Sequence, residues 1–265
     1  MNKIKAAFFD FDWTLFDHKT RSFIRSAIES IKEIQRNGIK VFINSARSYY
    51  SLAGLDTFNL INFDGFVVSN GGACLLENEI LYAHYLPETT AEQIIKICEE
   101  NKISYLLSTT KKSFIREFDK ENINSFYEVF YEAYAHPISE YKNEKIMIVQ
   151  VFCRKEQDYL FSEVKGVFPN RFCEWVTEFC SKEFIKSEGI NAIIQKFGLK
   201  PDEICAFGDD VNDIDMFKLV KYGVCMGNGK EEAKKYAYHI TTNIEDDGIK
   251  NGLIHLGLIK KSNAN

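Results

Sequence analysis

The chemistry open to this chain is first indicated by two carboxylates that stand two residues apart near its start, in the segment DFDWT at residues 10–14. An apolar run, residues 4–9, leads directly into Asp10, as a buried strand does before it delivers polar side chains to a site. In an extended chain Asp10 and Asp12 point to the same side. Acids are also common in plain turns and at helix starts, so the companions of this pair decide its meaning.

Those companions directly follow other apolar runs or begin a helical segment, and all of them except Ala46 are polar. They are Ser45, Ala46 and Arg47, then Asn70, then Lys186, and finally Asp209, Asn212 and Asp213. Carboxylates that converge from distant parts of a chain repel one another unless a cation neutralises them, and hard divalent ions prefer oxygen ligands. The residues therefore predict a Mg²⁺ site. Lys186 beside Ser45 would add a positive charge and a hydroxyl donor, which suit a phosphate group.

The elements that must position these residues alternate between strand and helix. Apolar runs at 39–43, 66–69 and 203–207 resemble buried strands, and each ends in polar residues. Apolar residues at helical spacing follow the first run, and a second helical segment covers 187–197 before Gly198. This alternation predicts an α/β fold with a Rossmann-like parallel sheet and a site along one edge.

From about Leu81 the regular alternation of strand and helix patterns stops. Extended stretches at 103–107, 114–117 and 145–153 are mixed with two helical segments. The alternation of buried strands and helices resumes after Lys186. We expect a core made of residues 1–81 and 186–265. Residues 82–185 are expected to form an inserted α+β domain that selects the substrate.

Composition limits the possible partners and location. The 265 residues carry 33 basic and 38 acidic side chains, a formal net charge of −5, so nucleic acid is not an expected partner. Seven scattered Cys without a Cys-x-x-Cys pair favour neither disulfides nor zinc, and the five His show no metal-ligand spacing. The sequence has no apolar run long enough to span a membrane, so a membrane is not an expected partner. We expect a cytoplasmic protein, and the sequence carries no signal for an oligomeric state.

On four motifs the sequence resembles the haloacid dehalogenase (HAD) superfamily, in particular its Cof-like sugar phosphatases with a large α/β cap. The family's first strand ends in D-x-D-x-[TV], matched at residues 10–14, and its second ends in a Ser or Thr, matched by Ser45. Its third motif begins with a Lys, matched by Lys186, and its fourth is G-D-x-x-N-D, matched at residues 208–213. The motifs occur in order, and the resemblance covers essentially the whole chain.

The resemblance implies a Mg²⁺-dependent phosphatase of small phosphorylated metabolites, with sugar phosphates as the expected substrates. Asp10 would be the nucleophile that forms an aspartyl-phosphate and would also bind the metal. Asp12 would protonate the leaving alcohol and activate water, with its backbone carbonyl on the metal. Asp209 would be a direct ligand, and Asp213 either a ligand or, with Asn212, a support for the ligands. The implied phosphate or substrate contacts are Ser45, Ala46, Arg47, Asn70, Lys186 and Asn212.

The chain departs from the family pattern at three positions. Trp13, Ala46 and Ser187 each stand where the family usually has Gly. Trp13 would narrow the entrance, stack on a sugar face or simply pack. None of the three removes a charged or nucleophilic group.

Three other functions are compatible with some of these residues. A phosphomutase or other phosphotransferase on the same scaffold would pass the phosphoryl group to an acceptor other than water. A receiver-like signalling domain also gathers acids, a Thr or Ser and a Lys around magnesium, but it is about half this length and does not pair its nucleophile with a second acid. A catalytically silent phosphate-binding protein is disfavoured because the motifs are complete.

Overall fold

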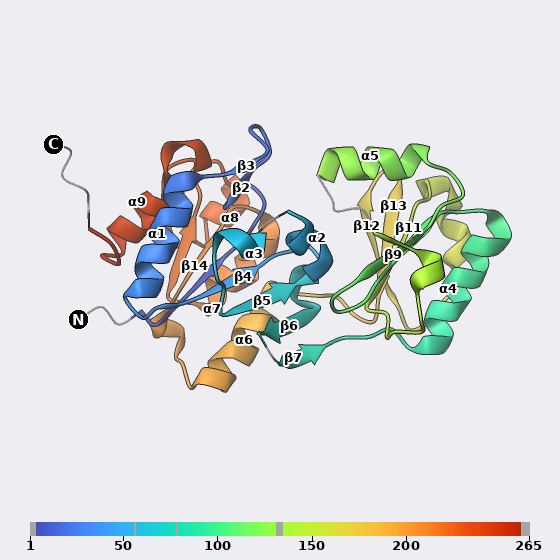
Figure 1. Ribbon diagram of the computed structural model, residues 1–265, viewed down its shortest axis with the longest axis horizontal. Coiled ribbons are helices and arrows are strands. Elements are labelled where there is room, and N and C mark those ends of the chain that lie inside the picture. Colours follow the sequence, from blue (N-terminus) through green and yellow to red (C-terminus); the bar gives the residue numbers. More distant parts are fainter. Residues whose placement is uncertain (1–3, 56, 78, 131–134, 261–265) are drawn as a thin grey trace. The chain divides into compact units, whose positions relative to one another are not determined.

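The computed structural model describes residues 4–55, 57–77, 79–130 and 135–260. The chain divides into two compact units (Figure 1), each of which is described by itself. The first comprises Met1–Arg47, Phe58–Tyr82 and Ile185–Asn265. The second comprises Ser48–Thr57 and Ala83–Phe184.

The first unit is built on a sheet with the strand order β16-β15-β14-β1-β4-β5-β6-β7. Its strands are β1 (Ala6–Phe9), β4 (Lys40–Asn44), β5 (Gly65–Val68), β6 (Ala73–Leu76), β7 (Ile80–Ala83), β14 (Ile204–Gly208), β15 (Tyr222–Cys225) and β16 (His239–Ile240). Neighbours from β16 to β5 pair in parallel, and β6 pairs antiparallel with β5. A small hairpin, β2 (Phe16–Asp17) and β3 (Ser22–Phe23), follows β1.

Helices cover both faces of this sheet because its strands are apolar on both sides. Phe8 and Ala206 are buried with residues of α6 (Lys186–Phe197) and α7 (Ile214–Leu219). The next residue of β1, Phe9, faces the other way and stacks on Phe207, with 5.1 Å between the ring centroids. A Cβ at Gly252 of α9 (Gly248–His255) would lie 2.5 Å from the Phe207 ring, so α9 packs against that face.

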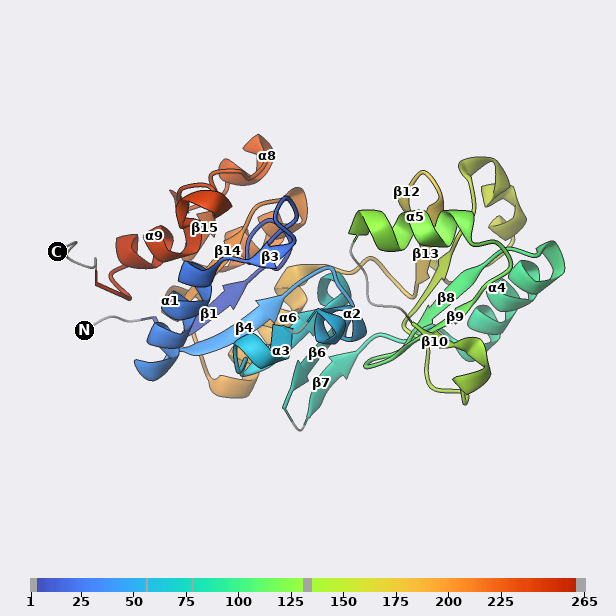
Figure 2. The same ribbon diagram turned by 45° about the horizontal axis from the view of Figure 1, so that its top comes forward.

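Helix α1 (Arg25–Arg36) packs beside α9, and both views show the two side by side (Figures 1 and 2). The described residues also include the short helices α2 (Tyr49–Gly54), α3 (Thr57–Leu60) and α8 (Glu231–Lys234). The predicted α/β fold with a parallel sheet is confirmed.

The second unit has a separate, largely antiparallel sheet, in the order β10-β9-β8-β11-β13-β12. Its strands are β8 (Tyr105–Ser108), β9 (Ser113–Arg116), β10 (His136–Pro137), β11 (Ile148–Val151), β12 (Phe168–Cys173) and β13 (Val176–Cys180). Leu107 is buried with Ile94 of α4 (Glu88–Asn101), whereas Leu106 is buried with Phe126 of α5 (Glu121–Phe130). Because successive residues of a strand face opposite sides, α4 and α5 cover opposite faces of this sheet.

Among the helices in the described parts of the chain, none combines the length and apolar character needed to cross a membrane.

Candidate active site

Four neighbouring parallel strands of the first unit deliver the candidate residues to one edge of the sheet. In the sheet they lie in the order β14, β1, β4 and β5. Asp209, Asp10 and Ser45 come directly after the first three of these strands, and Asn70 comes two residues after β5. Because adjacent strands lie about 4.8 Å apart, residues distant in sequence become neighbours here.

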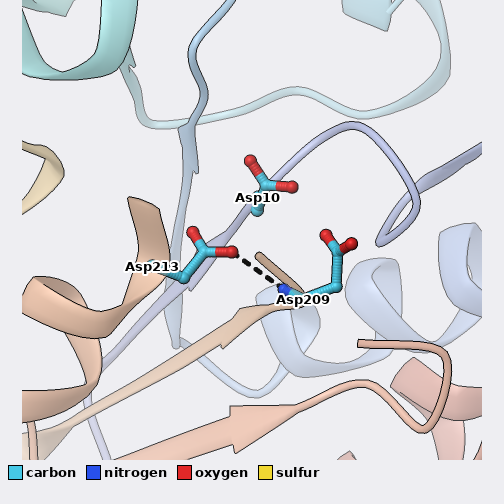
Figure 3. A group of neighbouring side chains, drawn as sticks. All are labelled: Asp10, Asp209 and Asp213. Atoms are coloured by element: carbon cyan, nitrogen blue, oxygen red, sulfur yellow. Dashed lines mark hydrogen bonds between the residues drawn. The ribbon is translucent and has the colours of Figure 1, made fainter. Parts of the chain in front are cut away.

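Three buried carboxylates meet at this edge. Asp10, Asp209 and Asp213 each offer an oxygen within 4.8 Å of the others (Figure 3). Asp213 ends a short 3-10 helix, Val211–Asp213, and its side chain turns back toward the strand end. A Cβ at Gly208 would lie 2.4 Å from the Asp213 carboxylate, so only glycine leaves room for this approach. We refer to the three side chains as the aspartate cluster.

Lys186 supplies a buried positive charge to the aspartate cluster. It is the first residue of α6 and is 1% exposed. Its Nζ donates to Asp10 Oδ1 at 2.5 Å and to Asp213 Oδ1 at 2.6 Å. Burial alone would lower the pKa of Lys186, but the charges of Asp10 and Asp213 raise it above its ordinary value. The side chain therefore stays an ammonium ion between two carboxylates.

One ammonium ion does not balance three buried carboxylates. Burial, together with the charges of the neighbouring acids, raises the pKa of Asp10 to about 7 and the pKa of Asp209 to about 9. Both side chains thus tend to hold protons unless another cation replaces them. A divalent ion with a preference for oxygen would do so, and the donor set of the aspartate cluster fits magnesium.

Within the aspartate cluster, Asp213 already has several hydrogen-bond partners. Its Oδ2 accepts from the backbone N–H groups of Asp209 at 2.8 Å and Asp210 at 3.0 Å, the first of which is drawn in Figure 3. Its Oδ1 accepts from Lys186. Asp209 in contrast accepts a side-chain hydrogen bond from Thr14, whose Oγ1 lies 3.1 Å from Asp209 Oδ1. Asp213 therefore fixes both Lys186 and the Asp209 backbone.

The Asp12 side chain is bonded by Arg47 and His18, whereas Lys186 donates to two members of the aspartate cluster. Arg47 Nε lies 3.0 Å from both of its oxygens, and Arg47 Nη2 lies 2.8 Å from Oδ1. His18 Nε2, from the hairpin that follows β1, lies 2.6 Å from the same Oδ1. Burial alone would raise the pKa of Asp12, but hydrogen bonds from His18 and Arg47 and the Arg47 charge lower it below its ordinary value.

The remaining predicted residues lie around these groups. Ser45 is buried, and its Oγ accepts from the Arg47 backbone N–H at 3.1 Å. Ala46, between them, is exposed. Asn70 adopts a left-handed backbone with φ 55°, and its Oδ1 accepts from Asn212 Nδ2 at 3.1 Å. Asn70 and Asn212, which come from distant parts of the sequence, are thus in direct contact.

Two residues that contact the acids of the site, Thr14 and His18, have no role predicted from the sequence. Thr14 stands inside the first motif, so the motif itself was the available signal. His18 lies six residues after Asp12 and shares no ligand spacing with another His, so nothing in the sequence indicated its contact.

The family model of the haloacid dehalogenase-like hydrolases matches residues 7–253. The chain belongs to this family. As a haloacid dehalogenase-like hydrolase it is an enzyme, and the resemblance inferred from its motifs is confirmed.

Individual relatives cover nearly the whole hydrolase. The Bacillus subtilis (strain 168) protein YkrA is 28% identical over 260 residues, 97% of this chain and 99% of its own. Another protein of that organism, 5-amino-6-(5-phospho-D-ribitylamino)uracil phosphatase YitU, is 26% identical over 258 residues, 91% of this chain and 93% of its own. The solved structure of BT4131, a HAD subclass IIB sugar phosphatase, has a TM-score of 0.76 at 27% identity, covering 96% of this chain and 100% of that chain.

Proposed function

We propose that this hydrolase is a Mg²⁺-dependent phosphatase of small phosphomonoesters, sugar phosphates among them, and that it works through an aspartyl-phosphate on Asp10. The observation that carries the proposal is the position of Asp10. It ends a buried strand, lies in the aspartate cluster and has one carboxylate oxygen 2.5 Å from Lys186 Nζ. The names of the relatives YitU and BT4131 agree with this chemistry.

The first step transfers the phosphoryl group to the enzyme. An Asp10 oxygen attacks phosphorus, and the bond between phosphorus and the ester oxygen breaks. Asp12, which must take up a proton before this step because Arg47 and His18 favour its charged form, gives that proton to the departing alcohol. Each pair of unit charges at about 4 Å costs about 4 kcal/mol at an effective dielectric of about 20, so an anion approaching a phosphate needs compensation. When bound, magnesium supplies positive charge that offsets this repulsion.

The second step returns the phosphoryl group to water. Asp12, now a carboxylate, takes a proton from water, whose oxygen attacks phosphorus, and the bond to Asp10 breaks to release inorganic phosphate. Arg47 and His18 favour the charged form of Asp12, which suits its role as the base in this step. Lys186, Ser45 and the exposed Ala46 backbone are the proposed holders of the phosphate oxygens.

Direct metal ligation is proposed for Asp10 and Asp209, with the Asp12 backbone carbonyl as a third donor. Asp213 is proposed to act by holding Lys186 and the Asp209 backbone, because its oxygens already accept three hydrogen bonds. Asn212 is proposed to hold Asn70 at the edge of the site.

Residues 82–185 are proposed to select the substrate. The seven Cys are all free thiols, which agrees with a proposed cytoplasmic location.

The test is a phosphate-release assay over a panel of phosphorylated metabolites, with Mg²⁺ or with a chelator. We expect hydrolysis of sugar phosphates with Mg²⁺, loss of activity with the chelator and no turnover by Asp10→Asn. Release of an isomerised sugar phosphate without free phosphate would instead indicate a mutase. Full activity after exhaustive chelation would contradict the proposed metal dependence.

A further inference from the structure

The backbone of Trp13 adopts a conformation that favours glycine. Its φ is 57°, in the left-handed region, where a bulky side chain is strained. Two hydrogen bonds hold it there: its N–H donates to the Phe16 carbonyl at 2.9 Å, and its carbonyl accepts from Asn228 Nδ2 at 2.9 Å. Glycine would meet the same backbone requirement without strain. The indole at this position therefore needs an explanation other than the turn itself.

Packing in the core does not provide that explanation. Trp13 is 36% exposed, in contrast to the fully buried Phe11 two residues earlier. Its ring centroid lies 5.1 Å from that of His18, with 31° between the ring planes. His18 Nε2 in turn lies 2.6 Å from Asp12 Oδ1. An accessible aromatic ring is thus separated by one side chain from the carboxyl group proposed to protonate the leaving alcohol.

A ring at this place can contact the part of a substrate that leaves with the alcohol. The face of an indole attracts another flat or apolar face, either an aromatic ring or the C–H face of a sugar ring. An acyclic alcohol such as glycerol offers no comparable face. A bulky residue held in a strained backbone conformation near a reacting group points to a role in function.

We propose that Trp13 is a specificity-determining residue that favours phosphomonoesters whose alcohol carries a ring with a flat apolar face. The proposal rests on the proposed phosphatase function. Trp13 acts on binding and does not touch the reacting atoms, so its removal weakens substrate binding more than it slows the chemical steps. Sugar rings and aromatic rings share this chemistry, and separate substrates distinguish them.

The experiment compares Trp13→Gly and Trp13→Phe with the wild type on glucose 6-phosphate, phenyl phosphate and glycerol 3-phosphate. For Trp13→Gly we expect KM to rise about tenfold on one or both ring substrates and to change about twofold at most on glycerol 3-phosphate. The kcat values should stay nearly constant. Trp13→Phe keeps a ring and should recover part of the lost binding. The ring substrate that responds identifies the preferred class.

A stability measurement separates this role from a structural one. Trp13→Gly should change Tm by no more than about 2–4 °C, because the left-handed strain that it relieves offsets the contact with His18 that it removes. Lys102, with φ 56° at the end of α4, is a matched control: Lys102→Gly relieves similar strain and should leave all three substrates unaffected. A fall in Tm together with an equal loss of kcat on all three substrates would show that the indole supports the fold, and would overturn the proposal.

The remaining outcomes distinguish this inference from the function on which it rests. If the wild type hydrolyses the three esters and Trp13→Gly keeps their KM ratios, the inference about Trp13 is wrong and the phosphatase proposal stands. If the wild type releases phosphate from none of them, the proposed function fails and the inference fails with it.

Discussion

Arg47 forms a two-pronged ion pair with Asp12, in which Nε lies 3.0 Å from both carboxylate oxygens and Nη2 lies 2.8 Å from Oδ1. The pair is partly accessible, since the Asp12 side chain is 31% exposed, so its contribution to stability is screened by water. The pair is important because it affects the protonation state of the Asp12 carboxyl group. Arg47 lowers the pKa of Asp12 and so favours its charged form, which is the form that can accept a proton.

Replacing Asp12 tests its proposed role as the base. Asp12→Asn cannot take a proton from water, so we expect the second step to slow by about a hundredfold or more. With 4-nitrophenyl phosphate, whose leaving group needs little protonation, rapid mixing should show a burst of one equivalent of nitrophenol before slow turnover. Glu231→Gln, at an exposed acid of α8, is the control and should behave as wild type. A steady state at the wild-type rate in Asp12→Asn would refute the assignment.

The response of stability to magnesium should depend on pH. The pKa of Asp10 is raised to about 7 and that of Asp209 to about 9, mainly by burial, so the folded protein binds more protons than the unfolded chain between about pH 4 and about pH 9. Without metal, these groups therefore make stability fall as pH rises across this range, Asp10 up to about pH 7 and Asp209 up to about pH 9. Magnesium replaces the protons, so the gain in Tm on adding Mg²⁺ should increase between pH 6 and pH 9.

This gain is measured by thermal unfolding with Mg²⁺ and with a chelator at each pH. Asp209→Asn should lose most of the gain at pH 8, because it removes a proposed ligand. A gain in Tm that stays constant or decreases with pH would argue against metal binding by these carboxylates.

Two neighbouring acids of one loop should differ sharply in their effect on stability. Asp213 is fully buried and accepts from Lys186 and two backbone N–H groups, whereas Asp210 is 40% exposed and pairs with Lys230. An amide at position 213 would point its NH₂ at one of these donors. We expect Asp213→Asn to reduce the free energy of unfolding by about 3 kcal/mol.

Asp210→Asn is the matched control, and it should change the free energy of unfolding by at most about 1 kcal/mol. Urea denaturation of both variants measures the difference. Equal effects would mean that the hydrogen bonds of Asp213 do not organise the loop.

The edge of the sheet could be predicted because the strands are short apolar runs that stop at polar residues. The run at 203–207 corresponds to β14 (Ile204–Gly208), and the helical segment at 187–197 corresponds to α6 (Lys186–Phe197). Both faces of these strands are buried, so hydrophobicity alone marks them. Once the strands are parallel, their polar ends must meet, and the approach of Asp10 to Asp209 follows.

Contacts made by the short hairpin after β1 could not be predicted in this way. Strands β2 and β3 have two residues each, too few for an alternating pattern, so the sequence did not indicate that His18 reaches Asp12. The resemblance implied that Arg47 contacts phosphate or substrate, and its pairing with Asp12 depends on side-chain geometry that the sequence does not indicate. The membership of Ser48–Thr57 in the second unit depends on tertiary contacts, such as the 5.2 Å between the rings of Tyr50 and His136.

The central claim is that Asp10 carries the phosphoryl group. Its most direct test is acid quenching of the enzyme during turnover of glucose 6-phosphate with Mg²⁺, followed by peptide mass spectrometry. We predict one phosphoryl group on the peptide that contains Asp10, lost on treatment with hydroxylamine and absent from Asp10→Asn. An enzyme that turns over at its full rate with no phosphoryl group on Asp10 at any quench time, or an Asp10→Asn variant that retains wild-type activity, would contradict the account.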